Sequence, residues 1–169
     1  MNAVLQALFH VPNFKKWLFS QYPSNGKCNH NKTECFLCTV AKTLQSTLQN
    51  SGSSIRPTDI HCKLKFVCPT MSFYRQEDAH EYLVSLMNKL KDSYSKNYSE
   101  IISSPIGDIF GGTFETVAKV GQCDKCKLPT TLISQSYFEE ITIPISNKKS
   151  VQDALQDFFA TENIPDFKC

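Results

Sequence analysis

The sequence predicts an α+β protein, with helices in residues 1–104 and a β-rich part in residues 105–169. In the first part, apolar residues recur at the three- and four-residue spacing of helices. After Gly111-Gly112 the pattern changes to the alternation that is typical of a strand. The 169 residues, 41% of them hydrophobic, are enough for one domain with a core or for part of a larger domain.

Charge and cysteine content narrow the class of protein. The formal net charge of +2 favours neither nucleic acid nor a membrane as a partner. No apolar run approaches the roughly 20 residues of a membrane span, and the N-terminus lacks the order of a signal peptide. We therefore expect a protein of the cytoplasm or the nucleus, where its eight cysteines are reduced and are better interpreted as metal ligands than as disulfides.

Three helices are expected before residue 50. Residues 1–9 form the first, and Pro12 opens a second that runs through Leu18. A first helix that begins abruptly at Met1 suggests that sequence upstream of it is missing. The third helix is expected over residues 35–49. Its predicted core stripe consists of Leu37, Val40, Ala41, Leu44 and Leu48.

The best-specified helix is expected to run from Arg75 to Lys91. Its predicted buried stripe consists of Ala79, Tyr82, Leu83, Leu86, Met87 and Leu90. Residues 76–78 provide an acidic first turn, which suits the positive end of the helix dipole. Asp78 and Glu81 lie roughly 120° around the helix from the stripe, on one exposed ridge. That ridge is either an ordinary solvated face or a functional surface.

The second part of the chain predicts two strands and a helix. The strands are expected near residues 113–120 and 137–145. Ser150, with Asp153 three residues on, caps the helix that follows. The apolar residues expected to face inward from this helix are Val151, Ala154, Leu155, Phe158 and Phe159.

Three cysteines of this part predict an incomplete zinc site. Cys123 and Cys126 form a CxxC pair between the two expected strands, where a tight turn can direct both thiolates at one metal. Cys169, at the end of the chain, offers a third ligand, so the fourth ligand of a tetrahedral zinc is missing. The alternative is that Cys123 and Cys126 are free thiols.

A second metal site is possible in the first part of the chain. Cys35 and Cys38 form a CxxC pair that opens the third helix, and Cys28 and His30 precede them in a polar loop. The alternative is that Cys38 is buried as a small apolar residue and Cys28 is a free loop thiol.

Three stretches, in this order, resemble the catalytic core of the ubiquitin-specific proteases, which are papain-like cysteine deubiquitinases. Residues 1–8, MNAVLQAL, are similar to the tail of the family's cysteine box. Residues 76–83, QEDAHEYL, resemble its Q-[D/E]-A-H-E-[F/Y]-L box. Residues 110–112, FGG, with the CxxC pair and Cys169, are similar to the family's fingers, in which two CxxC pairs hold a zinc. The resemblance covers essentially the whole chain.

The resemblance implies a papain-like core with a helical thumb, residues 1–104, and incomplete β-rich fingers and palm, residues 105–169. It implies hydrolysis of the bond after the C-terminal glycine of ubiquitin, with ubiquitin and ubiquitinated proteins as partners and structural zinc as the cofactor. The substrate-binding residues that it implies are Gln76, Asp78 and Glu81, with the two carboxylates pairing with the arginines of the ubiquitin tail.

The same resemblance places the catalytic groups outside the chain. The nucleophilic cysteine is expected before Met1 and the general-base histidine after Cys169, so we expect these residues by themselves to be inactive. Two alternatives remain open: a catalytically dead protein that binds ubiquitin, and a short zinc-ribbon interaction or nucleic-acid module. The absence of a basic stripe weighs against nucleic acid.

Overall fold

The protein is described by a computed structural model and divides into two compact units, Met1–Ile109 and Phe110–Cys169. The structure describes residues 1–21, 35–50, 52–98, 104–120 and 130–164. Helices together with a small antiparallel sheet confirm the predicted α+β class. The assignment of residues 1–104 to a thumb and of residues 105–169 to fingers and palm stays a prediction.

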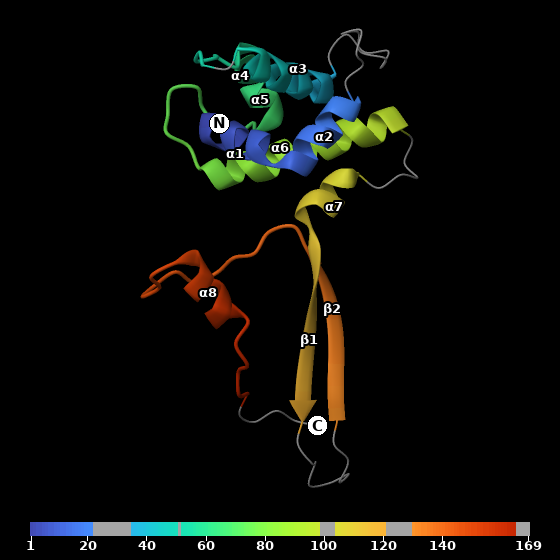
Figure 1. Ribbon diagram of the computed structural model, residues 1–169, viewed down its shortest axis with the longest axis vertical. Coiled ribbons are helices and arrows are strands. Elements are labelled where there is room, and N and C mark those ends of the chain that lie inside the picture. The colour runs from blue at the N-terminus through green and yellow to red at the C-terminus, as the bar shows by residue number, and fades with distance from the viewer. Residues whose placement is uncertain (22–34, 51, 99–103, 121–129, 165–169) are drawn as a thin grey trace. The chain divides into compact units, whose positions relative to one another are not determined.

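Seven helices are found in the described residues up to Phe110 (Figure 1). They are α1 (Asn2–His10), α2 (Pro12–Gln21), α3 (Phe36–Gln49), α4 (Thr58–Cys62), α5 (Leu64–Val67), α6 (Ala79–Tyr98) and α7 (Pro105–Phe110). The first three confirm the expected N-terminal helices to within one or a few residues. None of the described helices is long and apolar enough to cross a membrane.

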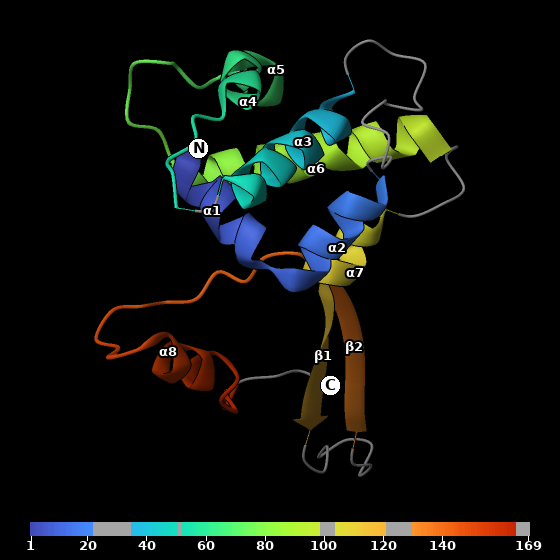
Figure 2. The same ribbon diagram turned by 45° about the horizontal axis from the view of Figure 1, so that its top comes forward.

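Helix α6 is the element around which the helical unit packs. It contacts α1, α3 and α5, and Figure 2 shows it running beside α3. Its stripe is confirmed at Tyr82, Leu86, Met87 and Leu90, which are buried, whereas Leu83 is half-buried. Tyr94 continues the stripe by one turn, and its ring lies 6.1 Å from that of Trp17 in α2. The residues of α2 and α3 that are completely buried are Phe14, Leu18, Leu37, Val40, Ala41 and Leu44.

The predicted start of this helix at Arg75 was wrong, because α6 begins at Ala79. The Asp78 carboxylate accepts hydrogen bonds from the backbone N–H groups of His80 (2.7 Å) and Glu81 (3.4 Å). An aspartate that binds the amides two and three positions ahead is an N-cap, and so it stands outside the first turn. Ala79 is exposed and does not belong to the buried stripe. At the other end α6 extends to Tyr98, past the predicted Lys91.

Leu48 was also placed wrongly, since 49% of it is exposed. Helical spacing does align it with Leu44, which is fully buried. Burial also requires a neighbouring element that extends as far along the helix axis, and the neighbours of α3 do not cover its last turn enough to bury Leu48. The periodicity of one helix carries no information about where its neighbours end.

The second unit contains a hairpin of β1 (Gly112–Val120) and β2 (Thr130–Phe138). The expected first strand is confirmed, but the expected second strand at residues 137–145 was wrong. Antiparallel pairing matches Gly112 with Phe138, so residues beyond Phe138 have no partner in β1. An added Cβ at Gly112 would lie 2.6 Å from Cζ of the Phe138 ring, so a larger residue there would require the ring to move.

Helix α8 (Val151–Phe158) begins at its predicted cap, where the Ser150 hydroxyl accepts a hydrogen bond from the Asp153 N–H at 3.1 Å. Of the five residues expected to face inward, Ala154 is buried and Leu155 is half-buried. Val151, Phe158 and Phe159 are exposed, which corrects the prediction. The two phenylalanine rings still contact the ring of Phe114, at 5.9 and 6.1 Å between centroids. A two-stranded sheet offers too little area to cover them fully.

The contrast between two leucines tests the assigned core. Leu86→Ala should lower the free energy of unfolding by about 2–5 kcal/mol, because it opens a cavity at a fully buried position. Leu48→Ala is the matched control and should cost less than about 1 kcal/mol, because it removes the same atoms from a half-exposed site. Chemical denaturation of the full-length variants measures both values. Equal losses would contradict the packing of α3 and α6 described above.

Candidate functional site

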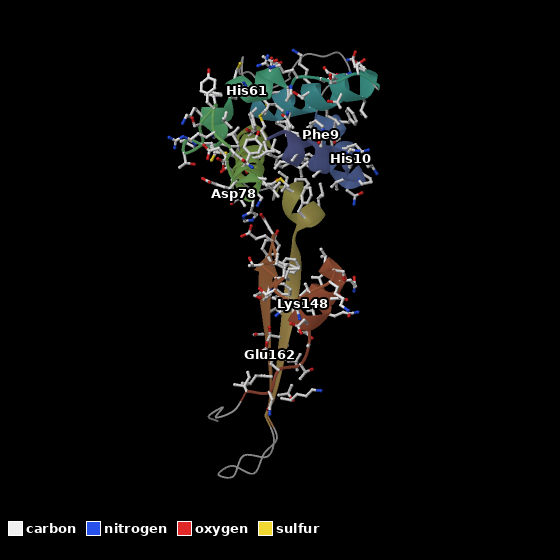
Figure 3. All side chains as sticks on the ribbon, turned by 90° about the vertical axis from the view of Figure 1, so that its left-hand side faces the viewer. Phe9, His10, His61, Asp78, Lys148 and Glu162 are labelled. Atoms are coloured by element: carbon white, nitrogen blue, oxygen red, sulfur yellow. The ribbon has the colours of Figure 1, made fainter. Side chains whose placement is uncertain are left out.

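The residues predicted to bind substrate lie at the start of α6 and in the segment before it. Gln76, Asp78 and Glu81 all have exposed side chains. Figure 3 shows Asp78 at the surface of the helical unit. The cap and the helix thus bring two carboxylates to one end of α6, three residues apart. The role of these residues in binding a substrate stays a prediction.

The Glu81 carboxylate is held by the segment that precedes the helix. The Thr70 hydroxyl donates a hydrogen bond to Glu81 Oε1 at 2.7 Å. The Cys68 thiol lies 3.7 Å from the same oxygen and 3.1 Å from Thr70 Oγ1. Cys68 is buried, whereas Thr70 and Glu81 are exposed, so the cluster extends from the core to the surface. Sequence reasoning missed this cluster, because no local pattern links Glu81 to residues that lie 11 and 13 positions earlier in the chain.

A second contact ties the same segment to the residues before α6. The Ser72 N–H donates a hydrogen bond to Glu77 Oε1 at 2.8 Å. Met71, between Thr70 and Ser72, is buried. Residues 68–78 are therefore anchored by side-chain contacts although they contain no helix or strand.

The Tyr82 side chain forms the inner boundary of this region. Burial raises the pKa of its phenol well above the usual value, and the nearby Cys68 adds to the shift. The hydroxyl accepts or donates no hydrogen bond among the described residues. Tyr82 therefore stays neutral and serves as a core residue. The pKa of Tyr82 is higher in the folded than in the unfolded protein. Its ionisation therefore favours unfolding only as the pH rises above about 10, where the phenol of the unfolded chain loses its proton.

Two of the described histidines, His10 and His61, have side-chain contacts. Nδ1 of His10 lies 2.6 Å from the carbonyl oxygen of Gln6, one turn earlier in α1. The ring of His61 lies against the ring of Phe73, with 5.1 Å between centroids. Figure 3 labels both histidines. His10 thus contacts its own helix, whereas His61 of α4 packs against a residue of the segment that precedes α6.

Most of the predicted metal ligands lie outside the described residues. This holds for Cys123, Cys126 and Cys169, and for Cys28 and His30 of the second candidate site. In chain order, the first two fall in the connection between β1 and β2. Both proposed zinc sites therefore stay predictions.

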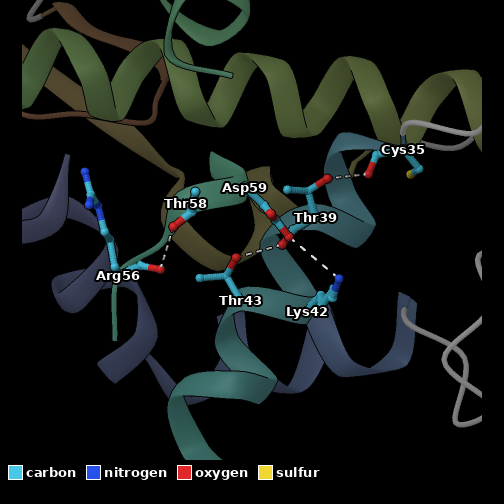
Figure 4. Close-up of polar contacts among 7 residues, drawn as sticks. All are labelled: Cys35, Thr39, Lys42, Thr43, Arg56, Thr58 and Asp59. Carbon is cyan, nitrogen blue, oxygen red and sulfur yellow. Dashed lines mark hydrogen bonds and ion pairs between the residues drawn. The ribbon is translucent and has the colours of Figure 1, made fainter. Parts of the chain in front are cut away.

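The remaining two candidate ligands stand at the start of α3. Cys35 precedes the helix and its carbonyl accepts a hydrogen bond from the Thr39 hydroxyl at 3.1 Å (Figure 4). Cys38 is buried, which suits a small apolar side chain as well as a ligand. Figure 4 also shows the ion pair of 3.7 Å between Lys42 and Asp59, which links α3 to α4. Within the described part of the chain, no cluster of three or more histidine, cysteine or acidic residues could hold a metal.

Comparison with known proteins gives matches across the whole chain. The family model described as "Ubiquitin carboxyl-terminal hydrolase" matches residues 1–161. Ubiquitin carboxyl-terminal hydrolase 36 of Drosophila ananassae is 34% identical over all of this chain, which spans 16% of that protein. The same-named protein of Drosophila grimshawi is 33% identical, and the chain spans 14% of it.

A solved structure has a similar fold. A chain in the structure of the SAGA Ubp8/Sgf11/Sus1/Sgf73 DUB module bound to ubiquitin aldehyde matches 99% of this chain, with a TM-score of 0.74. The sequence identity is 24%, and the match covers 37% of that chain. This likeness concerns the fold, and it includes both the helices and the hairpin.

Two substitutions distinguish the capping role of the Asp78 side chain from the effect of its negative charge. Asp78→Ala should lower the free energy of unfolding by about 1 kcal/mol, because two N–H groups at the start of α6 lose their acceptor. Asp78→Asn should cost much less, because its amide oxygen still accepts a hydrogen bond. Denaturation curves of the two full-length variants provide the comparison. Identical stabilities would show that Asp78 is not the cap.

Proposed function

The chain belongs to the ubiquitin carboxyl-terminal hydrolase family, and on that premise we propose that the whole protein hydrolyses the bond after the C-terminal glycine of ubiquitin. The chain spans 16% of the first of these relatives, so the activity is assigned to the protein as a whole. The observation that carries the proposal is the family match, which extends over residues 1–161 and includes both units. A zinc-ribbon module alone would not account for the matched helical unit.

Within this activity, the described residues contribute to substrate binding. Asp78 and Glu81 present two exposed carboxylates at the start of α6. In each, one oxygen is hydrogen-bonded within the protein, to the amides of His80 and Glu81 or to the Thr70 hydroxyl. The other oxygens remain available to an arginine of the ubiquitin tail, which pairs with carboxylates through charge-assisted hydrogen bonds. Gln76 offers a neutral amide beside them. We place no nucleophile and no general base among these residues.

The ligand that we assign to this surface is ubiquitin. In the similar solved structure, the module that contains the matching chain is bound to ubiquitin aldehyde, which supports the assignment. A ubiquitin-binding protein without activity is less favoured, because the relatives named above carry the name of a hydrolase. Ubiquitinated proteins are the substrates that follow from this chemistry.

We also propose structural zinc for the cysteine pairs. Four cysteine thiolates are the usual ligands of a structural zinc, and a CxxC pair supplies two of them from one turn. Cys123 and Cys126 stand in the connection of an antiparallel hairpin, a position that suits such a turn. Cys169 is the proposed third ligand of that site. Cys28, His30, Cys35 and Cys38 are the ligands of a proposed second site.

The acidic pair is tested by removing charge while keeping shape. In the full-length protein, the double variant Asp78→Asn, Glu81→Gln should raise KM for a fluorogenic ubiquitin substrate about 10- to 100-fold with little change in kcat. The expected size follows from the loss of charged hydrogen bonds at the tail. Asp92→Asn, an exposed aspartate farther along α6, is the matched control and should leave KM unchanged. If the double variant has the same KM and kcat as the parent, these carboxylates do not bind substrate and belong to an ordinary solvated face.

Zinc is tested by metal content instead of activity. The full-length protein should contain bound zinc, and Cys123→Ser together with Cys126→Ser should remove one zinc ion per molecule. Cys62→Ser changes an exposed cysteine of α4 and should leave the zinc content as it was. Metal analysis after extensive dialysis gives the values. A parent protein without zinc would contradict the proposal.

A further inference from the structure

We propose that Thr70 is a positioning residue for ubiquitin recognition, which acts by fixing the Glu81 carboxylate in the orientation that receives the cationic tail. The inference rests on the proposed function of Glu81. It adds a residue that lies outside α6 and belongs to none of the stretches that carry the family resemblance.

The contact between Thr70 and Glu81 has the geometry of a strong hydrogen bond. Its length of 2.7 Å falls in the range of a hydroxyl that donates to an ionised carboxylate. The Cys68 thiol approaches the same oxygen at 3.7 Å and lies 3.1 Å from the Thr70 hydroxyl. Oε1 of Glu81 is thus directed toward the protein.

Thr70 can hold Glu81 because its own backbone is anchored. Cys68, two residues before it, and Met71, the residue after it, are 2% and 3% exposed, so both side chains are fixed in the core. The Met71 N–H also donates a hydrogen bond to the Cys68 carbonyl at 3.2 Å. Next along the chain, the Ser72 N–H binds the Glu77 carboxylate. An exposed threonine that follows the buried Cys68 by two residues and directly precedes the buried Met71 is a rigid support for a surface side chain.

The consequence concerns the second oxygen of the carboxylate. An exposed glutamate ordinarily samples several rotamers, and a ligand must order it on binding. With Oε1 bound to Thr70, that ordering is done in advance. No described residue donates a hydrogen bond to Oε2 of Glu81 or to Oδ2 of Asp78. Two acceptors that are oriented before binding are suited to a guanidinium group.

The test compares three substitutions of Thr70 in the full-length protein. Thr70→Val replaces the hydroxyl by a methyl group, and Thr70→Ala removes it without replacement. Each substitution should raise KM for a fluorogenic ubiquitin substrate about three- to tenfold at unchanged kcat. Thr70→Ser keeps the hydroxyl and should retain the KM of the parent. A loss of folding would lower kcat or the amount of active enzyme instead.

A double-mutant cycle shows whether Thr70 acts through Glu81. In the Glu81→Gln background, Thr70→Val should change KM less than twofold, because the carboxylate that it positions is gone. The same loss of effect is expected with a ubiquitin substrate whose tail arginines are replaced by leucine. A change in KM that persists in either case, or an unchanged KM in Thr70→Val, overturns the inference.

The two proposals fail in different ways. If Glu81→Gln alone leaves KM unchanged, the proposed contact of Glu81 with the tail is wrong, and the role of Thr70 is wrong with it. If Glu81→Gln raises KM but neither Thr70→Val nor Thr70→Ala does, Glu81 binds the tail without help from Thr70. In that case only the inference about Thr70 is overturned.

Discussion

Burial of one face of α6 is the constraint on which the helical unit depends. Tyr82, Leu86 and Leu90 lie in successive turns and are almost completely enclosed by α1, α3 and the segments beside them. Each such side chain contributes about 1.5–3 kcal/mol when it leaves water, so rotation of the helix about its axis is strongly opposed. With the buried face set, the opposite positions are set as well, and Glu81 has to emerge at the surface beside the segment that contains Thr70.

At the start of α6, carboxylates that stabilise the fold are the same ones that we propose for substrate binding. Asp78 uses one oxygen to cap the helix, and Glu81 uses one to bind the Thr70 hydroxyl. Glu77 holds the backbone of Ser72 in the same way. The structural role of these carboxylates therefore does not compete with the proposed recognition, because each uses only one oxygen. It reduces the freedom that a ligand would otherwise have to remove, and it explains why replacement by alanine would mix a loss of stability with a loss of binding.

The second unit depends on fewer contacts than the first. Its sheet has only two strands among the described residues, so each strand has an open edge. Phe114 stacks on Phe138 at 4.1 Å between ring centroids and also meets the rings of Phe158 and Phe159. Aromatic contacts of this kind join the hairpin to α8. Leu132 and Ile133 of β2 remain largely exposed, as expected for a sheet without further partners.

Local patterns in the sequence by themselves determined the α+β class, the N-terminal helices, the Ser150 cap and the motifs of the family. These features depend on residues a few positions apart. The start of α6 was within reach too, because Asp78 is a good N-cap, but the acidic residues before it also suit a first turn. Only the tertiary structure decided the register of β2, the exposure of Leu48 and the contact of Thr70 with Glu81. Each of these depends on whether a residue of another segment lies opposite, and no spacing within a single element encodes that.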